Sequence, residues 1–111
     1  MSDCIFCKIA SKTIKSDIVY EDDKTLIFSD INPVAEHHYL VITKEHFSDI
    51  LALPESEIKY IHKAIKIVVE KFGLAKNGFR IVNNCGPDAG QAVPHVHFHV
   101  IAGRKLSWPP G

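Results

Sequence analysis

The chain has 111 residues, and its 13 Lys and Arg balance its 13 Asp and Glu, so the formal net charge is zero. This length predicts one domain, 1–111, built around a single hydrophobic core. The lysines are scattered, which argues against a groove that tracks the phosphates of a nucleic acid polymer but leaves small anionic ligands open.

The apolar pattern indicates neither export nor a membrane span. The first eight residues lack a basic segment followed by an apolar run, and no stretch approaches the roughly 20 apolar residues of a spanning helix. The three cysteines are an odd number and are better explained as thiols or metal ligands than as a disulfide framework. We therefore expect a cytoplasmic protein with no membrane partner.

The first half of the chain predicts three strands. Residues 18–20 and 25–28 are short apolar runs on either side of the polar turn 21–24, which is typical of a hairpin. Residues 39–43 are β-branched and aromatic, and their continuous apolar character indicates a strand that is buried on both faces.

A long helix is predicted from about Pro54 to Gly73. Proline suits the first turn of a helix, and glycine suits the left-handed residue that ends one. Apolar residues spaced three and four apart predict the face that packs on the core. This stripe consists of Ile58, Ile61, Ile65, Val68 and Phe72.

Two more strands are expected at 79–83 and 95–101. Strands separated by turns and by one long helix imply an α+β fold. We expect a mainly antiparallel five-stranded sheet with the long helix on one face, together with a short helix. The tail after residue 103 cannot extend a helix, and its lone Trp108 needs a surface on which to dock.

Three histidines at alternate positions, His95, His97 and His99, form the most informative pattern in the chain. Side chains alternate faces in a strand, so these rings should share one face at intervals of about 6.6 Å. Imidazoles can act near neutral pH as nucleophiles, proton donors or metal ligands. The preceding loop, residues 84–93, is suited to holding an anion. The pattern indicates an enzyme site, and an accidental run on an exposed strand is the alternative.

Residues 95–101 resemble the histidine triad (HIT) signature, and the chain is similar to the histidine triad nucleotide-binding proteins of the purine nucleoside phosphoramidase branch. The likeness extends from residues 5–6 through 21–23, 30–33, His38 and 90–91 to residues 108–111. It implies a HIT-like fold, a homodimer whose sheet continues across both chains, and a hydrolase. The implied substrates are purine nucleoside phosphoramidates and related nucleotidyl conjugates, with no cofactor required for catalysis.

The resemblance also implies the catalytic residues. His97 matches the nucleophile, which forms a covalent nucleotidyl-histidine while its inner nitrogen bonds a backbone carbonyl. His99 and His38 match histidines that bind phosphate oxygens and assist protonation of the amine leaving group. His95 completes the catalytic set.

Nucleotide-binding residues follow from the same resemblance. Asp30 matches a carboxylate that accepts hydrogen bonds from both ribose hydroxyls, with a turn cap as the alternative. Other matches lie beside the phosphate and ribose, in the tail that reaches the partner's site, and in an apolar base pocket. They are Asn84, Gly90, Gln91 and Ala92 in the loop, Trp108 in the tail, and Ile5, Phe6, Ile9, Ile14, Phe28 and Ile31 in the pocket.

Ala92 departs from the family pattern, because eukaryotic members carry a hydroxyl residue directly after the pair that matches Gly90 and Gln91. A side-chain donor near the phosphate or leaving group is thereby lost. Since backbone amides remain, we expect activity to survive with an altered rate and an altered preference for leaving groups.

Cys4 and Cys7 have the two-residue gap of a zinc knuckle, although a structural zinc site normally takes four ligands. Some bacterial members that this chain resembles complete such a set with two histidines, which match His46 and His95 here. Two reduced, partly buried thiols are the alternative. Cys85 fits no ligand pattern.

The sequence is compatible with three functional hypotheses. The first is metal-independent hydrolysis through His97, with any zinc ion structural. The second is a zinc-dependent hydrolase with His97 and His99 as ligands, although the sequence offers no acidic residue at an obvious third-ligand spacing. The third is a nucleotide-binding partner protein with weak catalysis, which Ala92 favours.

Overall fold

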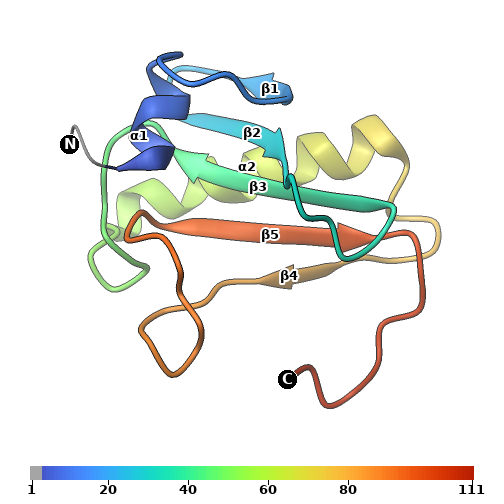
Figure 1. Ribbon diagram of the computed structural model, residues 1–111. Coiled ribbons are helices and arrows are strands. Elements are labelled where there is room, and N and C mark those ends of the chain that lie inside the picture. The colour runs from blue at the N-terminus through green and yellow to red at the C-terminus, as the bar shows by residue number, and fades with distance from the viewer. Residues whose placement is uncertain (1–3) are drawn as a thin grey trace.

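The computed structural model describes residues 4–111, which form one sheet with a helix on each side (Figure 1). The strand order is β1-β2-β3-β5-β4, and every neighbouring pair is antiparallel. The predicted α+β fold is therefore confirmed. In chain order the elements are α1 (Ile5–Ala10), β1 (Ile18–Glu21), β2 (Thr25–Ser29), β3 (His37–Thr43), α2 (Glu55–Phe72), β4 (Arg80–Val82) and β5 (His97–Ala102).

The long helix α2 covers one face of the sheet, as its apolar stripe predicted. Two acidic residues, Glu55 and Glu57, stand at the positive end of its dipole, and Gly73 ends it at φ 65°. Ile58 is 41% exposed, so the prediction was wrong for this residue, which the first turn holds at the solvent. The residues of α2 that are buried against the sheet are Ile61, Ala64, Ile65 and Val68.

The short helix α1 covers part of the opposite face (Figure 1). Phe6 and Ile9 are buried against the side chains of β2 and β3. Because a six-residue helix is too short to be stable by itself, α1 depends on these contacts. Strand β3 is thus buried on both faces, as its continuous apolar character predicted.

Strand β3 begins at His37, two residues earlier than expected, and this brings His38 into the sheet. In the pairing of β3 with β5, Ile42 is opposite His97 and Leu40 is opposite His99. Alternate residues of β3 share a face, so His38 lies on the same face of the sheet as these two histidines.

Strand β5 begins at His97, so the prediction that it starts at His95 was wrong. The N–H of Val96 donates to the carbonyl of Phe47, in the segment after β3, instead of joining the sheet ladder. On the side of β5 away from β3, strand β4 covers only Arg80–Val82, which is shorter than the expected 79–83. The side chain of Asn83 donates to the carbonyl of His97 at 2.8 Å where the regular ladder ends.

The C-terminal tail leaves β5 and turns away at the β4 edge of the sheet (Figure 1). Arg80 and Arg104 hold this segment, donating to the carbonyls of Ser107 and Val34 respectively. Trp108 beyond them is 81% exposed in the single chain. Within residues 4–111, neither helix combines the length and apolar character that crossing a membrane requires.

Candidate active site and metal centre

His97 is buried on the α1 face of the sheet, and its ring is fixed by the backbone just before β5. Its Nδ1 lies 2.7 Å from the carbonyl oxygen of His95. A carbonyl can only accept a hydrogen bond, so Nδ1 carries the proton and donates. In the neutral ring the lone pair is therefore on Nε2, the nitrogen that a nucleophile needs free.

His38, His99 and Asp30 form a hydrogen-bonded group beside His97. The Nε2 of His38 lies 2.9 Å from Nδ1 of His99 and 3.3 Å from Oδ2 of Asp30. The His99 ring centroid is 5.3 Å from that of His97. The sheet register thus places one carboxylate and three imidazoles in a single cluster.

The backbone determines the proton positions in this group. The N–H of Val34 donates to Nδ1 of His38 at 3.2 Å, so a neutral His38 carries its proton on Nε2. Burial lowers the pKa of His38, against the opposing effect of Asp30, and burial with nearby His97 and His38 lowers the pKa of His99 to about 4. His99 then accepts at Nδ1, and its Nε2–H is left as a free donor.

Because folding lowers the pKa of His99 to about 4, the protein should lose stability as pH falls from about 6.5 towards 4. The unfolded chain binds more protons in this window, so the free energy of unfolding decreases with falling pH. We expect His99 to account for about 1–2 kcal/mol, allowing for screening of a partly exposed ring. Urea unfolding at pH 7 and pH 4.5 should show a smaller loss for His99→Gln than for the wild type. The exposed His62 provides the control: His62→Gln should follow the wild type, and equal losses in all three proteins would contradict the prediction.

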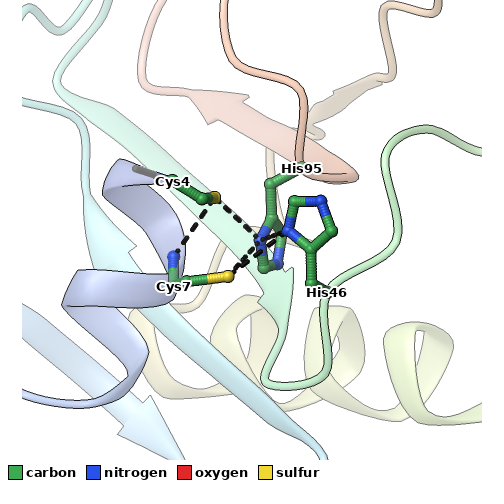
Figure 2. Close-up of side chains that lie close together, drawn as sticks. All are labelled: Cys4, Cys7, His46 and His95. Carbon is green, nitrogen blue, oxygen red and sulfur yellow. Dashed lines mark hydrogen bonds between the residues drawn. The ribbon is translucent and has the colours of Figure 1, made fainter. Parts of the chain in front are cut away.

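A second cluster brings together four side chains from three segments (Figure 2). Cys4 and Cys7 come from the start of α1, His46 from the segment after β3, and His95 from the segment before β5. Their ligand atoms all lie within 4.8 Å of one another. Figure 2 shows both thiols and both rings pointing toward a common centre.

The distances in this cluster fit a tetrahedral zinc ion. With usual bond lengths, such an ion separates two imidazole nitrogens by about 3.4 Å, and a sulfur from a nitrogen by about 3.6 Å. The two Nδ1 atoms of His46 and His95 are 3.3 Å apart. The sulfur to nitrogen distances are 3.3 Å for Cys4 to His95, 3.3 Å for Cys7 to His46 and 3.5 Å for Cys7 to His95.

The protonation of His95 also suits a metal ligand. Its Nε2 lies 2.7 Å from the carbonyl of Thr43, so Nε2 is the donor and Nδ1 presents a lone pair to the two sulfurs. Burial lowers the pKa of His95 to about 4, which keeps the ring neutral near pH 7.

The group of Asp30, His38 and His99 is a poorer fit to a metal, because Nε2 of His38 carries a proton that a metal would have to displace.

The profile of the HIT domain matches residues 11–106 of this sequence. The chain belongs to the HIT family. Among curated proteins, the "14 kDa zinc-binding protein" of Zea mays is 42% identical, over 99% of this chain and 89% of that protein. "Adenylylsulfatase HINT1" of Arabidopsis thaliana is 44% identical, over 99% of this chain and 78% of that protein. The solved structure of a HIT family hydrolase from Clostridium thermocellum has a TM-score of 0.92 at 40% identity and covers 96% of each chain.

The HIT fold brings only part of the expected base pocket together. Phe6 and Phe28 meet edge to face with ring centroids 5.5 Å apart, and Ile9 is buried in the same cluster. The other three residues are more open to solvent. Ile5 is 46% exposed, Ile14 37% and Ile31 90%.

The loop before β5 is folded by the side chain of Gln91. Its Oε1 accepts from the N–H of Gly86, and its Nε2 donates to the carbonyls of Ser48 and Val93. Gly90 has φ 85°, a conformation that favours glycine. Ala92 lines a cavity of about 400 Å³, together with Cys4, Ile5, His46, Ser48, Val93 and Pro94, beside the cluster of two cysteines and two histidines. Nucleotide contacts by Asn84, Gly90 and Gln91 stay a prediction.

Three groups that position the HIT histidines had no signal in the sequence. They are the carbonyl of Thr43, the N–H of Val34 and the side chain of Asn83. Two of them are backbone atoms, which every residue type supplies, and Asn83 could only be found by pairing β4 with β5. The ring of His37, outside both clusters, forms a hydrogen bond with the Tyr39 hydroxyl at 2.7 Å.

Proposed function

We propose that this HIT protein is a nucleotide-binding hydrolase that cleaves purine nucleoside phosphoramidates and related nucleotidyl conjugates through a covalent intermediate on His97. The observation that carries the proposal is the bond from Nδ1 of His97 to the carbonyl of His95, which leaves the lone pair on Nε2. The ring of His99 has its centroid 5.3 Å from that of His97, and its contact with His38 leaves its Nε2–H to act as an acid or phosphate donor.

In the proposed reaction, Nε2 of His97 attacks phosphorus, a phosphorus to nitrogen bond forms, and the bond to the amine breaks. The amine leaves with a proton that the group of His38 and His99 relays from solvent. Water then attacks the nucleotidyl-histidine, and the products are a nucleoside monophosphate and free His97. The names of two relatives support this chemistry, because one is an adenylylsulfatase and another a hydrolase.

A direct assay tests the function. Purified protein is incubated with adenosine 5′-phosphoramidate, and the release of AMP is followed with and without a strong chelator. We expect turnover that persists with the chelator present while the fold is intact. A protein that binds AMP but releases none from the substrate would overturn the hydrolase and leave a nucleotide-binding partner protein.

The zinc-dependent hydrolase with His97 and His99 as ligands is disfavoured. Nδ1 of His99 faces the Nε2–H of His38, so its own Nε2 carries a proton in the neutral ring. A metal on Nε2 of His99 would have to displace that proton. Turnover abolished by chelation in a protein that stays folded would restore this alternative.

Asp30 is proposed to accept hydrogen bonds from both ribose hydroxyls. Its Oδ1 already accepts from the N–H of Asn32 at 2.8 Å, and Asp30→Asn keeps that oxygen while removing the charge. We expect AMP affinity to fall at least about tenfold, since hydrogen bonds to a charged acceptor contribute about 1.5–3 kcal/mol each. Calorimetry with 2′,3′-dideoxyadenosine monophosphate is the control, and an equal loss for both ligands would argue against the ribose contact.

A structural zinc ion is proposed in the cluster of Cys4, Cys7, His46 and His95. The tetrahedral distances support it, as does the name of the zinc-binding relative from maize. When bound, the ion would link α1 to the segments that flank β3 and β5. Thiolate ligands require reducing conditions, which is consistent with the cytoplasm.

A homodimer that extends the sheet is proposed through β4. This edge strand presents Ile81, which is 46% exposed, and it follows Phe79, which is 39% exposed. At the opposite edge, Lys71 already donates to the β1 carbonyl of Val19. Sedimentation should show a dimer for the wild type. It should show a weaker dimer for Ile81→Lys, because the substitution places a charge on this edge.

Trp108 is proposed to contact the partner subunit and to influence leaving-group selection. Deleting residues 106–111 removes a mostly exposed arm and one hydrogen bond from Arg80, so we expect only a small change in melting temperature. The ratio of kcat/KM for phosphoramidates of small and bulky amines should change instead. Identical ratios in the deleted and full-length proteins would refute a role for the tail.

A further inference from the structure

Phe6 packs against both the cluster of Cys4, Cys7, His46 and His95 and the proposed nucleophile His97. In sequence it lies between the two cysteines of the cluster. Its ring meets the ring of His95 with centroids 5.9 Å apart and the ring of His97 with centroids 5.0 Å apart, both edge to face. It is only 7% exposed, so it has little room to move without disturbing these neighbours.

His95 provides a second link between the two sites. Its ring faces the sulfur of Cys4 at 3.3 Å, while its own carbonyl accepts the Nδ1–H of His97 at 2.7 Å. The ring is fully buried, and Thr43 holds its other nitrogen. Any shift of His95 when a metal binds is therefore passed to the hydrogen bond that orients His97.

The helix that carries Phe6 is short and begins at the two cysteines of the cluster. Helix α1 has six residues, and Cys4 caps it by accepting the N–H of Cys7 at 3.4 Å. A helix this short cannot persist without tertiary contacts. A metal bound to Cys4 and Cys7 would fix the chain on both sides of Phe6. It would thereby also fix the ring of Phe6 against His97.

We infer that metal binding at Cys4, Cys7, His46 and His95 and nucleotide binding beside His97 are coupled through Phe6 and the His95 carbonyl. The inference rests on the proposed function for the nucleotide site. The coupling is positive, because the metal orders a wall of the pocket that the nucleotide would otherwise have to order. It is also reciprocal, so each ligand raises the affinity for the other by the same factor, about fivefold or more.

The first measurement is the Kd for AMP by calorimetry, with the zinc-loaded and the chelated protein. Circular dichroism checks that the chelated protein is folded. We expect AMP to bind at least about fivefold more weakly without zinc. Equal Kd values in two folded forms would overturn the coupling while leaving the proposed function intact. If neither form binds AMP, the proposed function and the coupling both fail.

The second measurement starts from the zinc-loaded protein and reads the affinity for zinc. Zinc affinity is measured by equilibrium competition with a chromogenic chelator, with and without saturating AMP. We expect AMP to raise the affinity for zinc about fivefold or more, and an equal affinity with and without AMP would overturn the inference. His62→Gln is the matched control, because this exposed histidine on α2 lies outside the cluster and outside the loop 84–93 and should leave the effect of AMP unchanged.

Phe6→Leu tests the route of the coupling. The substitution keeps all four ligands and an apolar side chain but removes the aromatic edge from His97. We expect zinc to bind with one ion per chain and the effect of AMP on zinc affinity to shrink. An undiminished effect in Phe6→Leu would overturn the route through this ring.

Discussion

Replacing His97 with alanine is expected to lower the turnover of adenosine 5′-phosphoramidate by a factor of about 10³ or more. The substitution removes the ring whose Nε2 lone pair is left free because the carbonyl of His95 holds its Nδ1. AMP should still bind, because Asp30 and the apolar pocket stay in place. Release of AMP from the substrate and calorimetric binding of AMP are the two measurements.

Two controls make this result specific to His97. His62→Ala changes an exposed histidine on α2 and should leave turnover unchanged. Added imidazole should restore part of the activity of His97→Gly, since it supplies the missing nucleophile in the space that the ring occupied. Turnover by His97→Ala at the wild-type rate would end the proposal of a covalent intermediate.

Loss of the metal is expected to have the second largest effect, on stability. Zinc at about 1,000 times its Kd stabilises a folded protein by about 4 kcal/mol, which corresponds to roughly 15 °C in melting temperature for a chain of this size. Cys7→Ser should therefore melt at a much lower temperature than the wild type. Elemental analysis should find one zinc ion per wild-type chain and none in Cys7→Ser.

Cys85→Ser is the matched control for the metal prediction, because it removes a thiol that lies outside the cluster. It should keep both the zinc ion and the melting temperature of the wild type. A wild-type protein that is free of zinc after preparation in zinc-containing medium would refute the site. Equal melting temperatures for wild type and Cys7→Ser would show that the cluster does not stabilise the fold.

Much of the architecture could be predicted because the core residues repeat at regular intervals. The stripe of α2 was correct except for Ile58, and the apolar run of β3 correctly indicated burial on both faces. The predicted ends of β5 and β4 were less accurate than the predicted core positions. Their limits depend on hydrogen bonds from Val96 and Asn83 to distant partners, which local periodicity does not report.

The sequence by itself determined which residues can do chemistry: the alternating histidines, the paired cysteines at the start of α1 and the acidic residue before Asn32. The family resemblance gave His95 and His97 different expected roles, and the tertiary structure supplies the contacts that separate them. The ring of His95 meets Cys4, 91 residues away, and Thr43, 52 residues away, while the ring of His97 bonds a backbone carbonyl. The physical reason is that a carbonyl or an N–H fixes the proton on an imidazole, and these backbone groups are the same in every residue, so the sequence carries no trace of which one a histidine will face.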